Sequence, residues 1–132
     1  MSIEVAVFQH LANNVPSVNN RVYALVAPQG AGSPYIVINK VSGVRDYTMQ
    51  GESAVVTARY QFTVYALGYA AAKATTKEIQ AAFSGFKGQM GGAGGAWVEG
   101  CFYQNEIDGF DTSLSASGYY QVITDYLIKH YE

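Results

Sequence analysis

The clearest pattern in the chain is an alternation of apolar and polar residues over residues 54–67, AVVTARYQFTVYAL. Its even positions are Ala54, Val56, Ala58, Tyr60, Phe62, Val64 and Ala66, and its odd positions include Thr57, Arg59, Gln61 and Thr63. A period of two places alternate side chains on opposite faces of a β-strand. We therefore predict a long strand with one buried face. Its register is fixed, because a one-residue slip would expose the whole apolar set.

Two other segments have helical character. Residues 3–11 or 3–13 carry apolar residues at helical spacing, and Pro16 follows as a stop. Gly68 interrupts the long strand, and residues 69–83 are then rich in Ala, Lys and Gln, which favour helix. We expect one helix at the start of the chain and one directly after the long strand.

Four further runs are typical of strands, because β-branched and aromatic residues are frequent in them. These runs are residues 21–26, 34–42, 96–107 and 119–132. The last has apolar residues on both faces, which fits a strand that is covered on both sides. Loops are predicted at residues 27–34, 88–95 and 108–118, and residues 43–53 are a hairpin loop or an irregular extension.

The order helix, strand, strand, strand, helix, strand, strand favours an α+β fold. In this fold two α-helices pack on one face of an antiparallel or mixed β-sheet. A length of 132 residues suits one domain, which spans residues 1–132.

Composition adds a hint of self-association. Charged residues make up 14% of the chain, whereas about a quarter is usual in soluble domains. The chain also has 11 tyrosines, whose apolar body and polar tip suit surfaces that become buried on assembly. The formal net charge is −2 and the basic residues are scattered, so no sequence-specific binding of nucleic acid is predicted.

Cysteine usage and hydropathy bear on the compartment. The single cysteine, Cys101, allows no internal disulfide and fits a reduced cytosolic origin. The first residues, MSIEVAVFQH, do not have the order of a signal peptide, and no apolar run is long enough to span a membrane. No membrane partner is expected.

The glycine-rich run at residues 88–96, GQMGGAGGA, raises the question of a phosphate-binding loop. Such a loop follows a strand and opens a helix, whose amide groups point at the anion. Here the run precedes a predicted strand, and neither a P-loop nor a dinucleotide-binding spacing is present. We interpret it as a connector from helix to strand.

Other candidates for chemistry have ordinary structural interpretations. His10 and His130 lack metal-ligand spacing and are expected to be solvated or structural. Cys101 lies in a predicted strand among aromatic residues, as a small apolar side chain would. The acidic cluster Glu106, Asp108 and Asp111 lacks the order of a calcium loop. No catalytic residue, metal ligand or cofactor is predicted, and the chain is not expected to be an enzyme.

Arg45, Asp46 and Arg59 are the charged residues whose role stays open. They are either surface charges of little energetic weight or pairs across subunits, which would set register more than affinity. The candidate subunit-interface residues are Arg45, Asp46, Tyr47, Arg59, Gln61 and Tyr65.

The ordered motifs of the chain resemble a known family. Residues 21–51, RVYALVAPQGAGSPYIVINKVSGVRDYTMQG, and residues 58–66, ARYQFTVYA, are similar to the tail-completion, or tail-terminator, proteins of long-tailed bacteriophages and prophages. The matching elements are RVY at 21–23, PQGA at 28–31, PYIV at 34–37, SGVRD at 42–46, FSGFKG at 83–88 and the aromatic closing strand. The resemblance lies in the order and spacing of these elements and covers nearly the whole chain.

The resemblance implies a structural virion protein that assembles in the host cytoplasm and remains in the phage tail. Members of the family are expected to form a ring, a hexamer, that caps the head-proximal end of the tail tube. The ring ends tube polymerisation and offers a surface for head–tail joining. The implied partners are further copies of the chain, the tail tube protein and a head–tail connector protein, and DNA can pass through the ring.

Two alternatives stay open from the residues alone. One is another head–tail connector or tail-tube component of similar fold. The other is a small oligomeric ligand-binding module or enzyme, which would need convergent polar groups in a pocket.

Overall fold

The fold is α+β, as predicted. The computed structural model describes residues 3–18, 21–25, 33–48, 51–91, 95–111 and 119–131. Two α-helices, α1 (Ile3–Asn14) and α2 (Tyr69–Phe83), and a 3-10 turn (Pro16–Val18) accompany one mixed sheet. Its strands are β1 (Val22–Ala24), β2 (Tyr35–Thr48), β3 (Gly51–Ala66), β4 (Gly88–Met90), β5 (Ala96–Asp111) and β6 (Tyr119–Tyr131).

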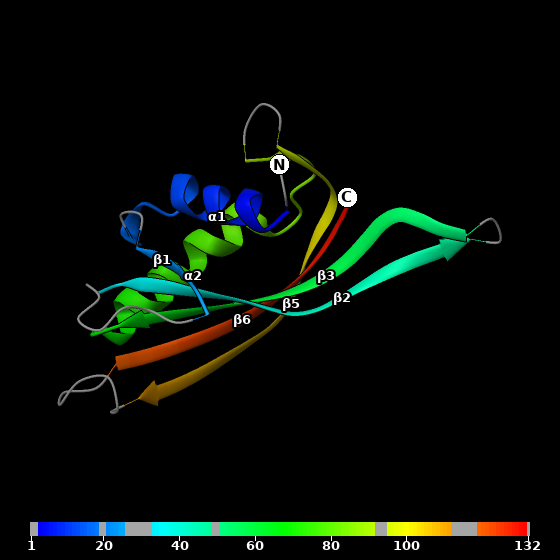
Figure 1. Ribbon diagram of the computed structural model, residues 1–132. Helices are drawn as coiled ribbons and strands as arrows, with labels where there is room; N and C mark the ends of the chain where they lie inside the picture. Colours follow the sequence, from blue (N-terminus) through cyan, green and yellow to red (C-terminus); the bar gives the residue numbers. More distant parts are fainter. Residues whose placement is uncertain are drawn as a thin grey trace.

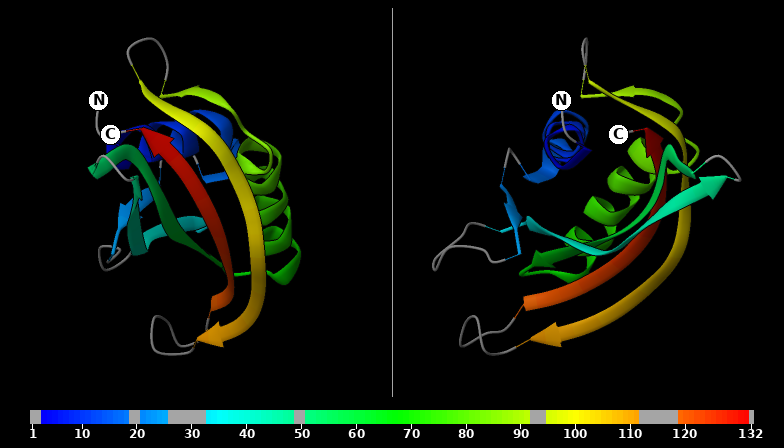
Figure 2. Two further views of the ribbon diagram at one scale, coloured as in Figure 1. Left: turned by 90° about the vertical axis from the view of Figure 1, so that its right-hand side faces the viewer. Right: turned by 45° about the vertical axis from the view of Figure 1, so that its right-hand side comes forward.

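Four long strands form the centre of the sheet, and two short strands lie at its borders. The order is β1-β2-β3-β6-β5-β4. β1 runs parallel to β2, and every other neighbouring pair is antiparallel. The sheet is strongly curved, and the far ends of β2 and β3 extend beyond the rest of the molecule (Figures 1 and 2).

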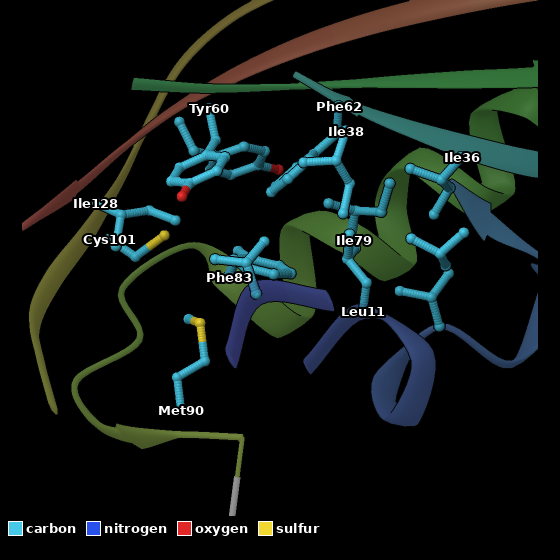
Figure 3. Close-up of a cluster of buried hydrophobic side chains, with 14 of the residues drawn as sticks. Leu11, Ile36, Ile38, Tyr60, Phe62, Ile79, Phe83, Met90, Cys101 and Ile128 are labelled. Atoms are coloured by element: carbon cyan, nitrogen blue, oxygen red, sulfur yellow. The ribbon is translucent and has the colours of Figure 1, made fainter. Parts of the chain in front are cut away.

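The even-numbered residues of β3 and β6 form what we call the even face, which packs into the core. Its buried members are Val56, Ala58, Tyr60, Phe62, Val64, Ala66, Val122, Thr124, Tyr126, Ile128 and His130. Phe62 meets Phe83 of α2 at 5.0 Å between ring centroids and Tyr126 at 5.5 Å. Figure 3 shows Phe62 and Phe83 converging with Ile79 of α2 and Leu11 of α1. The buried face predicted from the alternation is therefore confirmed.

The two helices contact each other through a histidine. The Nε2 atom of His10 lies 2.8 Å from the Ala82 carbonyl oxygen in α2. The same ring meets Phe83 and Phe86 edge-on, with centroids 4.8 and 4.6 Å away. His10 thus ties α1 to α2. His130 lies buried on the even face, so both histidines have structural positions.

Three segments in which we predicted loops contain strand residues in the structure. β2 continues to Thr48 and β3 begins at Gly51, which replaces most of the predicted loop at 43–53. β5 likewise continues to Asp111, into the predicted loop at 108–118. Long backbone ladders with β3 and β6 hold these polar, glycine-containing residues extended, although their composition favours turns. β4 (Gly88–Met90) lies within the glycine-rich segment that we interpreted as a connector, because it pairs with Ala96–Val98 of β5. Residues 27–32, 92–94 and 112–118 of the predicted loops lie outside the described residues.

Register shifts interrupt the alternation in both long outer strands. β2 has shifts between Lys40 and Ser42 and beyond Arg45. β5 has shifts between Val98 and Gly100 and between Tyr103 and Asn105. An extra residue at a β-bulge reverses the face on which later side chains point. Glu106 and Asp108 therefore share the even face with Tyr126, whereas Phe102 and Ile107 lie on the opposite face.

Candidate assembly surface

The other face of β3 and β6, which we call the odd face, is the most distinctive surface of the molecule. It carries Thr57, Arg59, Gln61, Thr63 and Tyr65 from β3, and Gln121, Ile123, Asp125, Leu127 and Lys129 from β6. Most of these side chains are half-buried or exposed, and Thr63 and Asp125 are buried. The β3 residues of this face are the odd positions of the alternation, and Arg59 is the charged residue among them.

An ion pair crosses the centre of the odd face. The Nη2 atom of Arg59 donates to the Oδ2 atom of Asp125 at 2.7 Å, diagonally across the β3–β6 ladder. The Arg59 side chain is 44% exposed, whereas that of Asp125 is 12% exposed. Asp125 Oδ1 is buried and has no hydrogen-bond partner within the described ranges. The guanidinium of Arg59 therefore compensates a carboxylate that is largely removed from water.

A cluster of tyrosines lies at one end of the odd face. Tyr35 of β2 and Tyr65 of β3 are directly opposite and stack, with ring centroids 5.0 Å apart. Tyr23 and Tyr119 meet Tyr35 edge-on at 6.0 and 5.9 Å. The Tyr65 hydroxyl accepts a hydrogen bond from Gln121 Nε2 at 3.1 Å. These contacts hold four aromatic side chains from four strands in fixed positions.

Exposed apolar side chains flank this face on β5. Phe102 lies opposite Leu127 and is 55% exposed, and Ile107 lies opposite Ile123 and is 52% exposed. The Phe102 ring covers Gly100, where a Cβ atom would come within 2.8 Å of the ring. Gly100 thus leaves space for an aromatic ring to lie along the strand. Exposed apolar side chains next to a group of polar side chains are typical of an interaction surface.

The six candidate interface residues divide into two groups. Arg59, Gln61 and Tyr65 share the odd face of β3. Arg45, Asp46 and Tyr47 belong to the far part of β2, where Arg45 is opposite Val56 and Tyr47 is opposite Glu52. The side chains of these three β2 residues lie outside the described part of the structure.

The acidic cluster on β5 has an internal partner. Lys73 of α2 donates to Asp108 at 2.6 Å and to Glu106 at 2.8 Å, and the Tyr69 hydroxyl donates to Asp108 at 2.8 Å. The hydrogen bonds from Lys73 and then from Tyr69 lower the pKa of Asp108. The hydrogen bonds to Asp108 and then to Glu106 raise the pKa of Lys73. Glu106 and Asp108 therefore attach β5 to α2 from within a strand, although Asp108 lies in the segment 108–118 that we predicted to be a loop.

Other features offer little chemistry. Burial raises the pKa of the Cys101 thiol to about 12, so the thiol stays protonated at neutral pH. Within the described residues no group of three or more His, Cys, Asp or Glu side chains could hold a metal ion. Among the described residues, no helix is long and apolar enough to cross a membrane. A hollow of about 430 Å³ beside α1 is lined by Glu4, Val5, Phe8, Gln9 and Ala12 and is almost wholly apolar.

Sequence reasoning missed three members of this surface. Asp125 gave no signal, because its partner Arg59 lies on another strand and only the β3–β6 register brings them together. Phe102 and Ile107 were missed because the register shifts in β5 hide the period-two pattern. Aligning the two strands by their buried residues would have paired Arg59 with Leu127 and placed Asp125 one step along the same face.

Comparisons with known proteins bear on what this surface serves. The model of the family described as "Tail completion protein gp17" matches residues 5–99. No curated protein matches the sequence of the chain. A chain in the solved structure of the virion of a native gene transfer agent (GTA) particle has a similar fold, with a TM-score of 0.72 and 15% sequence identity. That alignment covers 99% of this chain and 96% of the other. This chain therefore belongs to the tail completion protein gp17 family and is a structural protein of the bacteriophage tail.

Proposed function

We propose that the chain caps the head-proximal end of the tail tube as a hexameric ring. In this proposal the ring ends polymerisation of the tube and presents the surface to which the head–tail connector binds. DNA passes through the ring without being read. Family membership supports a role in completing the tail, and the odd face is the observation that carries the proposal further.

The odd face has the properties that an assembling subunit needs. Phe102 and Ile107 are exposed apolar groups on a face whose centre is polar, and the fixed tyrosine cluster lies at one end of that face. We infer that both helices cover the even face, which leaves the odd face for other proteins. Fixed side chains lose little conformational entropy on binding, so they favour tight association.

Interface positions follow from this arrangement. We propose that Arg59, Gln61 and Tyr65 contact a neighbouring protein through the odd face, and that Arg45, Asp46 and Tyr47 do so from the far end of β2. Arg59 is already paired with Asp125 within the chain. Its exposed part can donate a further hydrogen bond, and so it would set register between proteins as well as within the sheet.

Termination then has a physical explanation. A heterologous contact that closes by rotation makes a ring without a free end in its own plane. One side of the ring matches the last layer of the tube and the other side does not. The tube stops growing because no site remains for another tube ring, and the unmatched side is free to join the head.

The experiment is to delete the gene and to measure the tails by electron microscopy. We expect overlong tails that do not join to heads, and restoration of normal length by the wild-type chain. Particles without any tube would instead identify a tube component. Tails of normal length that join to heads would contradict the proposal.

Two variants connect this experiment to the odd face. Ile107→Asp places a charge on the exposed apolar position and is expected to leave the fold intact but to fail in restoring tail length. Gln80→Asp, at an exposed position of α2, is the matched control and should restore it. Equal restoration by both variants would exclude Ile107 from the interface.

A further inference from the structure

Both outer long strands of the sheet have stretches that no other described strand covers. β1 pairs with β2 only at Ile36, Val37 and Ile38. β4 pairs with β5 only from Ala96 to Val98, and the Cys101 carbonyl accepts from the Gly85 amide at 2.9 Å. Within the described ranges, this leaves the outer edge of β2 open over residues 39–48 and that of β5 open over residues 102–111. We call these stretches the β2 edge and the β5 edge.

An open edge is a row of unpaired amide and carbonyl groups. Natural proteins usually cover such edges or keep them short, because they are templates for pairing with another chain. This chain has one at each end of a single sheet, and the two are of similar length. Two complementary edges on one molecule allow head-to-tail association of copies.

The strand directions suit that association. Each step from β2 through β3 and β6 to β5 is antiparallel, so β2 and β5 run in opposite directions. Rotation about an axis to which the strands are tilted would place β5 of one copy beside β2 of the next. The contact would be antiparallel and would continue the alternation of the sheet.

The two short strands, β1 and β4, lie at opposite ends of the sheet along the strand direction. Ile36, which pairs with β1, is at the same level across β3 and β6 as Asp108 of β5. Val98, beside β4, is in line with Arg45 of β2. A junction that avoids both short strands must therefore be offset along the strand direction. Such an offset is required when a tilted sheet closes on itself.

The charges of the two strands are also complementary. β5 contains Glu99, Glu106, Asp108 and Asp111 and no lysine or arginine, whereas β2 contains Lys40 and Arg45 with a single acid, Asp46. Lys40 is already paired with Glu4, and Glu106 and Asp108 are already paired with Lys73, within the chain. The difference in sign between the two strands therefore acts mainly against the pairing of β5 with β5, which would bring acidic strands together.

We propose that copies of this chain join by antiparallel pairing of the β2 edge of one copy with the β5 edge of the next. The four long strands of each copy then form one continuous sheet around the ring, in which the β2 edge and the β5 edge are both paired. This inference rests on the proposed function, because it specifies how the copies of that ring are joined.

Cysteine pairs test the junction in assembled tails. In a Cys101→Ala background, Ser42→Cys on β2 is combined in turn with Gln104→Cys, Asn105→Cys or Ile107→Cys on β5, all at exposed positions. After oxidation, at least one combination should give a ladder of covalent multimers on a non-reducing gel. Ser42→Cys with Gln80→Cys, on the exposed side of α2, is the control and should give no ladder.

The unmodified chain gives a second measurement. Amide hydrogen exchange within residues 39–48 and 102–111 should be at least about tenfold slower in tails than in the free chain, because assembly would pair the outward amides. Unchanged exchange in both stretches would overturn the proposal. So would the absence of a ladder from every combination in tails of normal length, a result that leaves the capping function intact. Normal tails without the chain would instead overturn the capping function.

Discussion

The even and odd faces belong to the same strands, β3 and β6, but they differ in what they meet. On the even face Phe62 is buried against Phe83 and Tyr126. On the odd face Arg59 is 44% exposed and reaches one buried carboxylate. The first face is fixed by exclusion of water, and the second by directed polar contacts. One stretch of sequence thus specifies both a core and a surface, and substitutions should affect the two faces very differently.

The largest effect is expected in the core. Phe62→Ala removes a fully buried ring and leaves a cavity between β3, β6 and α2. It should lower the free energy of unfolding by about 3–5 kcal/mol, as measured by urea denaturation. Gln61→Ala on the odd face is the control and should change it by less than about 0.5 kcal/mol. Similar losses for both variants would remove the distinction between the faces.

Loss of the Arg59–Asp125 ion pair should have the second-largest effect on the free energy of unfolding. Arg59→Met keeps much of the side-chain volume but leaves the Asp125 carboxylate uncompensated, so a loss of about 1–3 kcal/mol is expected. Asp125→Asn in the same chain should recover part of that loss, since a neutral amide costs less to bury than a charge. If the double variant were less stable than Arg59→Met, the pair would not act through charge compensation.

Two tyrosine hydroxyls provide a finer test. Tyr60 OH, on the even face, is buried without a hydrogen-bond partner among the described residues. Tyr65 OH, on the odd face, accepts from Gln121. Tyr65→Phe should cost about 0.5–1.5 kcal/mol, whereas Tyr60→Phe should be neutral or slightly stabilising. Thermal unfolding of the two variants side by side would measure this difference, and a larger loss from Tyr60→Phe would contradict it.

The smallest effect concerns the surface contact between α2 and β5. Lys73 lowers the pKa of Asp108. A carboxyl group with a lowered folded pKa contributes stability above its unfolded pKa, and this stability is lost as the pH falls through the folded pKa. Below about pH 4 the melting temperature of the wild type should therefore fall more steeply than that of Lys73→Met. Parallel pH profiles would show that the contact adds no stability.

The sequence was sufficient for elements in which one face is buried. α1, β3 and α2 have nearly the predicted bounds, and the even positions of β3 are buried as the alternation indicated. In these elements the apolar residues recur with the period of the helix or strand, because only one face is buried. The presence of Arg59, Gln61 and Tyr65 on one face followed from the same period.

The sequence was insufficient where pairing partners decide the structure. Gly43 and Val44 are exposed, and residues 108–110 carry no buried side chain, so no hydrophobic pattern marks these segments as strands. They are extended because β3 and β6 lie beside them. The Arg59–Asp125 pair likewise depends on a register between strands that are distant in sequence. Such information is a property of the assembled sheet and not of any single segment.

The register shift after Tyr103 has a consequence for how this chain can change over time. Gln104 is an extra residue opposite β6, between the pairs Tyr103–Tyr126 and Asn105–Asp125. Loss of that one codon would remove the bulge and leave both pairs in place, so Asp108 would still face α2 and Ile107 would still face outward. This position should therefore tolerate the loss of a residue, whereas the loss of one residue from the regular ladder would invert the side chains beyond it.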